Sequence, residues 1–323
     1  MDEVYVRAPA RTRFPALNLI LFLATVLTTL WTGFYLSSAQ AAALGGAVPE
    51  AAFSLLAAAR AGLPFAGSLV AVLLAHEMGH YLFARRHRVD ATLPFFIPFL
   101  PFPFGVGTLG AVIRIRSLMP SRRAVLDIGV AGPIAGFLVA VPLLFWGYAH
   151  SPVASLQPVP APLPSALNMV RHWLGLLPPL SDGEEIIFGR SLLAHLALSV
   201  THPALAPGTE VTEHPVAIAA WFGLYVTTLN LLPIGQLDGG HVLYALLGRE
   251  RAFRASRLFS FALFLFGALV SWTWFAWWAV TRVLVGNRHP PALEEGSLGR
   301  GRRALALLGV VLFIVTFTPI PIR

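Results

Sequence analysis

The stretch of sequence that decides the fold is PFAGSLVAVLLAHEMGHYLFA, residues 64–84, which places His76-Glu77-Met78-Gly79-His80 inside an apolar run. The run is long enough to cross a bilayer as a helix. Residues four apart share a helix face, so the imidazoles of His76 and His80 can reach one zinc ion, and Glu77 beside them can act as a base. A metal-hydrolase motif therefore lies where a transmembrane helix is expected.

The same five-residue pattern also arises by chance in soluble helices, where it carries no chemistry. Its position in this chain argues against chance. An ionisable group at membrane depth costs about 2.5–3.5 kcal/mol, so a cluster of such groups is tolerated only if a metal or a polar cavity compensates.

Composition independently predicts a membrane protein, because a chain with 56% hydrophobic and 12% charged residues has too little charge for a soluble domain. We predict an all-α polytopic protein with about six transmembrane helices, in a single membrane-embedded domain over residues 1–323. The apolar runs that support this prediction are residues 17–36, 64–84, 124–148, 215–232, 258–280 and 304–320.

The net charge of +8 could indicate a nucleic-acid partner, yet every basic side chain is Arg and most lie just outside the apolar runs. This placement favours the headgroups of the lipid bilayer over nucleic acid as the partner. The positive-inside rule puts the segments before the first run and between the second and third in the cytosol, with the active site toward the cytosolic side. The arginines of residues 282–303 do not agree with the positive-inside rule, since a six-helix topology puts them on the side opposite the cytosol.

The first apolar run could also be a signal peptide, because arginines precede it and Ala39-Gln40-Ala41 resembles a cleavage site. Its apolar core exceeds the roughly 7–15 residues of a signal peptide, which favours a retained helix. The preceding residues include Asp2 and Glu3 and do not resemble an organellar transit peptide. We therefore expect a multi-pass protein of a prokaryotic plasma membrane.

The chain contains no Cys, so its zinc ligands must be nitrogen or oxygen atoms. A catalytic zinc usually takes three protein ligands, and two His on one helix need a third ligand from elsewhere. Asp127 is not chosen as the third ligand, because it lies at the very start of the third apolar run. The acidic residues of the connection 149–214 lie too far outside, and these are Glu184, Glu185, Glu210 and Glu213.

Asp238 remains as the third ligand. It belongs to NLLPIGQLDGG, residues 230–240, in which Pro233 is expected to break the fourth helix. Such a break is viable at membrane depth only where it is buried in protein or lines a wet cavity. The spacing therefore predicts His76, His80 and Asp238 as ligands.

On these two motifs the chain resembles the site-2 protease family of intramembrane zinc metalloproteases. The second motif is Asn-x-x-Pro-x-x-x-Leu-Asp-Gly in the family, and it matches Asn230, Pro233, Leu237, Asp238 and Gly239. Similar stretches at residues 105–115 and 128–136 extend the resemblance over about residues 64–250, the expected catalytic core.

The resemblance implies one zinc ion per chain, bound by His76, His80 and Asp238, with Glu77 as the catalytic base. Asn230 corresponds to a polar residue that engages the substrate backbone or the oxyanion, although an Asn beside a helix break could equally cap freed backbone groups. The implied activity is hydrolysis of peptide bonds within or next to transmembrane segments of a membrane protein or peptide. Such cleavage serves regulated intramembrane proteolysis or the clearance of membrane peptides.

Two other function classes are a metal transporter and a catalytically inactive membrane scaffold. A transporter does not need a base beside two ligands, and the chain retains Glu77 and all three ligands, so both points favour the protease. Some members of the family contain a PDZ domain. The longest polar connection here, residues 149–214, is Pro-rich and too short for one.

Residues 93–104 are too apolar for an exposed loop and too rich in Pro for a helix, so we expect them to dip into the membrane. Residues 109–116 alternate in side-chain character and include several β-branched side chains, a pattern that predicts a strand. In relatives this region resembles a re-entrant β-hairpin beside the active site, where an unwound substrate could add as a strand. An amphipathic surface loop is the alternative.

Several small or titratable residues are left without a catalytic role. Gly129, Gly132 and Gly136 are expected to permit close helix packing. His241 could support a ligand or only pack between helices. Residues 185–200 are expected to form an amphipathic segment on the outer face, near His195, His202 and His214.

Overall fold

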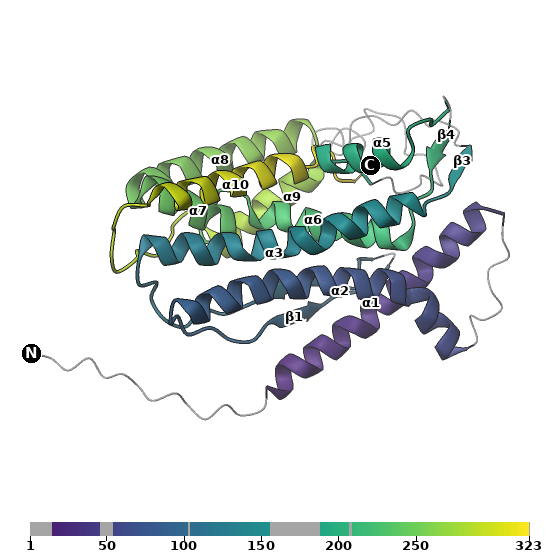
Figure 1. The fold of residues 1–323 in the computed structure, drawn as a ribbon, viewed down its shortest axis with the longest axis horizontal. Coiled ribbons are helices and arrows are strands. Elements are labelled where there is room, and N and C mark those ends of the chain that lie inside the picture. Colours follow the sequence, from purple (N-terminus) through teal and green to yellow (C-terminus); the bar gives the residue numbers. More distant parts are fainter. Residues whose placement is uncertain (1–14, 46–53, 103, 156–187, 207–208, 323) are drawn as a thin grey trace, which may run out of the picture.

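A computed structural model describes residues 15–322 of the chain, except 46–53, 103, 156–187 and 207–208. The described part is mostly helical, with two small antiparallel sheets, and the predicted fold class is confirmed (Figure 1). By length and composition, four of the described helices could cross a membrane: α1, Ala16–Ala43; α2, Leu55–Arg86; α3, Arg122–Ala149; and α8, Arg249–Leu269.

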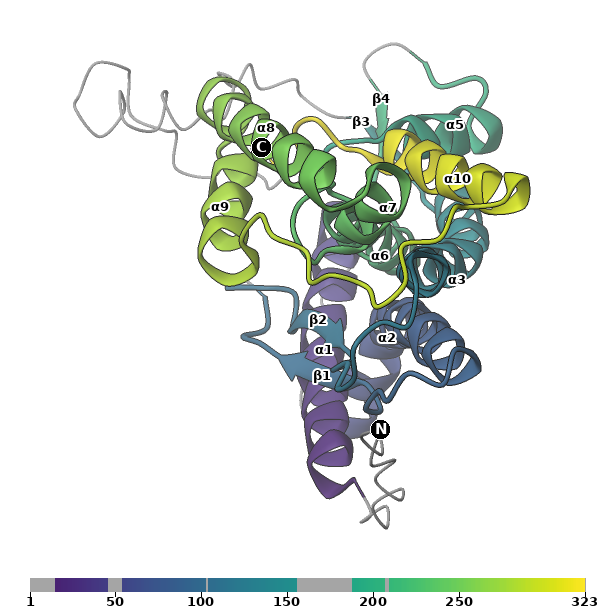
Figure 2. The ribbon, with the colours of Figure 1, turned by 90° about the vertical axis from the view of Figure 1, so that its left-hand side faces the viewer.

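The other helices are shorter. They are α5, Leu192–Thr201; α6, Pro215–Asn230; α7, Asp238–Leu247; α9, Trp272–Val280, with a following π-helical turn, Thr281–Val285; and α10, Arg300–Thr316. α6 is buried along most of its length because α2, α3 and α10 pack around it (Figure 2). It ends at Asn230, before Pro233, as the sequence predicts.

Close packing at the centre depends on glycines. A Cβ atom at Gly79 of α2 would lie 2.5 Å from the carbonyl oxygen of Ala131 in α3. A Cβ atom at Gly223 of α6 would lie 2.5 Å from Cγ1 of Val72 in α2. Ordinary van der Waals contact needs 3.4 Å or more, so only glycine allows α3 and α6 to approach α2 this closely.

The stretch 258–280, expected as one transmembrane helix, is divided at Val270 and Ser271 into α8 and α9. The two arms fold back on each other, because the ring of Phe264 in α8 lies 5.7 Å from that of Phe275 and 4.8 Å from that of Trp278 in α9. Gly267 makes this turn possible, since a side chain there would collide with the backbone of Phe275.

The α8–α9 turn brings the chain back to the end of the molecule where α8 began. Arg288, which follows α9, lies 5.4 Å from the ring centre of Phe253 near the start of α8. The amide of Leu293 then donates to the carbonyl of Met119 at 3.0 Å, just before α3. The arginines of residues 282–303 therefore share one end of the molecule with those that precede α3. The misfit noted for these arginines does not arise in the structure, because 258–280 is not one straight helix.

The predicted strand is present, and it forms a hairpin with the Pro-rich segment. β1, Phe95–Pro98, pairs antiparallel with β2, Thr108–Val112. α1 holds the connection between them, where the Thr28 hydroxyl donates to the carbonyl of Gly107 at 2.6 Å. The hairpin lies against α1 and α2 (Figure 2). A second sheet, β3, Val153–Ser155, and β4, Thr209–Val211, lies where α3 ends.

Candidate metal centre

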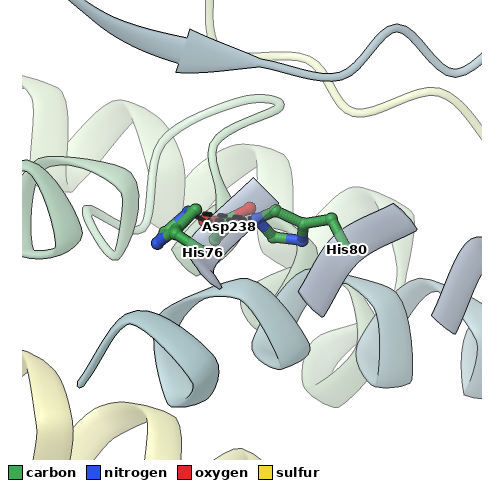
Figure 3. Close-up of side chains that lie close together, drawn as sticks. All are labelled: His76, His80 and Asp238. Atoms are coloured by element: carbon green, nitrogen blue, oxygen red, sulfur yellow. Dashed lines mark hydrogen bonds and ion pairs between the residues drawn. The ribbon is translucent and has the colours of Figure 1, made fainter. Parts of the chain in front are cut away.

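The three predicted ligands meet at one point inside the helix bundle (Figure 3). His76 and His80 lie one turn apart on α2, with their Nε2 atoms 3.1 Å apart. Asp238, the first residue of α7, places Oδ2 3.3 Å from each Nε2 atom. All three residues are buried, and among the described residues they form the only group of His, Asp and Glu with metal-binding geometry.

A hydrogen bond to the main chain determines which nitrogen of His80 faces this point. Nδ1 of His80 lies 2.8 Å from the carbonyl oxygen of Ile128, which can only accept, so Nδ1 carries the proton and Nε2 of the neutral ring has a free lone pair. Oδ2 of Asp238 is buried and has no hydrogen-bond donor. The lone pairs of His80 Nε2 and Asp238 Oδ2, 3.3 Å apart in a buried space, repel one another unless a cation lies between them, and with His76 alongside the donor set fits zinc.

The turn between α6 and α7 brings Asp238 to the two histidines. Gly235 has a φ of +53°, a left-handed conformation that favours glycine. Side chains at Gly239 and Gly240 would collide with the carbonyl oxygens of Leu231 and Gly235. α7 can therefore start directly against the end of α6, at the depth of the two histidines.

Glu77 and Asn230, the two predicted catalytic residues, also lie at this point. Glu77 is buried, and its carboxyl group faces the main-chain amide of Ile113, just after β2. The side-chain amide of Asn230 lies 3.2 Å from Nε2 of His76. The end of the β1–β2 hairpin thus lies beside the glutamate, while the last residue of α6 lies beside a histidine.

Two glycines of α3 pack directly against the predicted ligands. A side chain at Gly132 would overlap the imidazole of His80, and one at Gly136 would lie 3.2 Å from Cβ of His76. Close packing was predicted for these glycines, but its connection with the ligands was not. The sequence does contain a pattern that could have revealed this contact. The two glycines on α3 are four residues apart, the same spacing as the two histidines on α2.

Asp127, at the start of the third apolar run, forms an ion pair that no pattern in the sequence predicts. Asp127 is buried and accepts hydrogen bonds from Arg302 of α10 at 2.7 and 3.0 Å. Nε2 of His87, which follows α2, lies 3.0 Å from the same carboxylate. This cluster joins α2, α3 and α10 next to Ile128, whose carbonyl orients His80.

His241 is not part of the ligand group. Its Nδ1 lies 2.6 Å from Nε2 of His289, and its Cβ packs against Gly129 of α3. The His289 ring in turn stacks on Tyr244, with centroids 4.3 Å apart. His241 therefore holds the segment after α9 against α7. This contact agrees with the expectation that His241 packs between helices.

The remaining acidic residues and histidines lie near the other end of α3. Glu210 and Glu213 lie 3.2 and 4.0 Å from the guanidinium of Arg190. His214 caps α6, because its Nδ1 accepts a hydrogen bond from the amide of Val216. Most of the segment expected to be amphipathic, residues 185–200, is helical as α5, while Glu184 and Glu185 lie outside the described residues.

Comparison with known proteins places this chain in a recognised family. The model of "Peptidase family M50" matches residues 64–271. The rice protein "Probable zinc metalloprotease EGY1, chloroplastic" is 31% identical over 267 residues, which cover 82% of this chain and 42% of that protein. The Arabidopsis thaliana protein "Probable zinc metalloprotease EGY2, chloroplastic" is 30% identical over 277 residues, 84% of this chain and 44% of its own length.

The chain spans about two fifths of the length of the curated relatives it matches. No solved structure matches it. The family match covers the helix with both histidines, the β1–β2 hairpin, α3 and the turn with Asp238. The chain belongs to peptidase family M50.

Proposed function

We propose that the protein is an intramembrane zinc metalloprotease that hydrolyses peptide bonds within or next to transmembrane segments of membrane proteins. The observation that carries the proposal is the convergence of His76, His80 and Asp238 in a buried site with Glu77 beside it. A transport path needs ligands but no adjacent base, so this arrangement supports hydrolysis. The catalytic core, about residues 64–250, would lie within a single membrane-embedded domain.

Zinc held by His76, His80 and Asp238 would supply Lewis-acid activation of the scissile carbonyl and of water. As water attacks, an oxygen–carbon bond forms and the peptide carbon–nitrogen bond breaks. Glu77 accepts the proton from the attacking water and returns it to the leaving amine. Burial of Glu77 keeps its carboxyl group away from bulk water, so the proton stays within the site.

Asn230 and the hairpin would handle the substrate. The Asn230 amide, next to His76, can donate to the substrate backbone or to the oxyanion that develops on its carbonyl. β2 ends beside Glu77, so a substrate strand added along this hairpin would present an exposed peptide bond to the base. An intact helix hides that bond, which makes strand addition a route to cleavage.

We infer that the protein is a multi-pass protein of a prokaryotic plasma membrane and that its active site opens toward the cytosol. The gathering of the arginine-rich segments at one end supports this orientation, because basic residues mark the cytosolic side. The proposed substrates are transmembrane proteins or peptides, cut for signalling or for clearance.

Cleavage of model transmembrane substrates by the purified protein in detergent with zinc tests the proposal. Replacing Glu77→Gln should lower the cleavage rate by about 10²–10⁴-fold while one zinc per chain remains bound. Glu250→Gln is the matched control, since Glu250 is exposed at the start of α8 and the same charge is removed. It should cut at the wild-type rate.

Equal cleavage by the wild type and Glu77→Gln would contradict the role of Glu77. If no form cuts any substrate although zinc is bound, zinc flux in liposomes becomes decisive. Flux would favour a transporter, and its absence would favour a scaffold.

A further inference from the structure

A polar cavity of about 140 Å³ opens at the arginine-rich end of the molecule, between the start of α3, the end of α7 and the start of α10. Its lining includes two arginines, Arg122 and Arg303, together with Ser297. The other lining residues are apolar, and none carries a carboxylate. Since all its charge is positive, the cavity suits an anion.

Neither arginine is neutralised by the described part of the protein. Nη2 of Arg122 donates to the carbonyl of Ala245 at 2.6 Å, while its buried Nε has no acceptor. Arg303 is exposed and forms no ion pair with a described carboxylate. Arg302 differs, because its charge is paired with Asp127. Two positive charges thus face the cavity without an anionic partner.

The backbone adds to this positive potential. α10 begins beside the cavity, and its N-cap residue Gly299 offers no side chain to the free amides of the first turn. That turn also contains no acidic residue. The helix dipole leaves about half a positive charge at such an end, which reinforces the two guanidinium groups.

We propose that this cavity binds the phosphate of an anionic phospholipid headgroup. It lies at the start of α3, a helix long enough to span a bilayer, where the headgroup layer would meet the protein. Planar guanidinium groups match phosphate oxygens with two parallel hydrogen bonds. A bound headgroup would join α3, α7 and α10, and α7 carries Asp238.

Free inorganic phosphate shares this chemistry, so the experiment includes both sources. The purified full-length protein, in a neutral detergent, is titrated with short-chain phosphatidylglycerol, with phosphatidylcholine and with inorganic phosphate. Thermal unfolding reports binding to each. We expect phosphatidylglycerol to raise the unfolding midpoint of the wild type, and phosphatidylcholine and inorganic phosphate to have little effect.

Arg303→Gln should weaken phosphatidylglycerol binding about tenfold or more, the effect of losing a charged hydrogen bond. Arg300→Gln is the matched control, because it removes the same charge from the same exposed turn but lies outside the cavity lining. It should weaken binding less than about fivefold. Arg122→Lys, which keeps the charge but removes the planar fork, should give an intermediate loss.

Three results would overturn the proposal. Equal weakening by Arg303→Gln and Arg300→Gln would mean general attraction to lipid instead of a site. Equal stabilisation by phosphatidylcholine would show that the negative charge is not recognised. Stabilisation by inorganic phosphate alone, lost in Arg303→Gln, would assign the cavity to a soluble anion.

Discussion

Gly132 of α3 leaves room for the imidazole of His80, a proposed metal ligand. A Cβ atom at this position would overlap the imidazole, with Cε1 only 2.5 Å away, whereas ordinary contact begins at 3.4 Å. In Gly132→Ala the ring must therefore retreat by at least about 0.9 Å, the difference between these two distances, since Nε2 and Cδ2 would lie closer still; otherwise α3 must move away from α2.

Either response should disable the metal site. Metal–ligand distances tolerate deviations of about 0.2 Å, so a ring displaced this far no longer binds together with His76 and Asp238. Displacing α3 instead would cost about 1–3 kcal/mol of overpacking and would move the Ile128 carbonyl that orients His80. Losing an orienting contact alone lowers metal affinity about 10–100-fold, so we expect at least a 100-fold loss in Gly132→Ala.

Gly136→Ala provides the comparison, because it makes the same change one turn further along α3. Its added Cβ atom would lie 3.2 Å from Cβ of His76 and 3.3 Å from Nδ1, so a shift of a few tenths of an ångström relieves the contact. Competition of the purified proteins with a zinc chelator measures both affinities, and circular dichroism monitors the fold. If Gly132→Ala holds zinc as tightly as Gly136→Ala, the reasoning about His80 is refuted.

Two further predictions concern stability. Asp127→Asn should lower the free energy of unfolding by about 2 kcal/mol, because Arg302 loses its charged acceptor. An SDS unfolding titration measures this loss, with the exposed Asp90→Asn as the control. Burial, reinforced by His150, lowers the pKa of His214, so the unfolded chain binds the proton more readily and stability falls as pH drops below about 6.5. His214→Asn keeps an acceptor for α6 but does not titrate, so its unfolding midpoint should change less with pH than that of the wild type; an identical pH profile would exclude His214 as the cause.

Much of the site could be predicted from the sequence because its geometry is largely local. Four-residue spacing puts His76 and His80 on one helix face whatever surrounds the helix. Pro233 and the following glycines must break the fourth helix, which leaves Asp238 as the available acid at membrane depth. The structure brings these three residues together.

The path of the C-terminal third could not be predicted in the same way. The hydropathy of residues 258–280 predicts one continuous apolar helix. It does not predict the turn inside this stretch, because the segments on both sides of the turn are equally apolar. The turn depends on contacts between Phe264 and Trp278 and on the close approach at Gly267. The side on which the following arginines lie depends on that turn.

By itself, the sequence indicated the class of the protein and predicted a ligand set and a base, since composition and helical periodicity act over a few residues. Only the tertiary structure decided that the Ile128 carbonyl selects the tautomer of His80, that Asp127 pairs with Arg302, and that Arg122 and Arg303 share a cavity. These partners come from different helices. Their meeting depends on how close the helices pack and where the chain turns back, which no short stretch of sequence encodes.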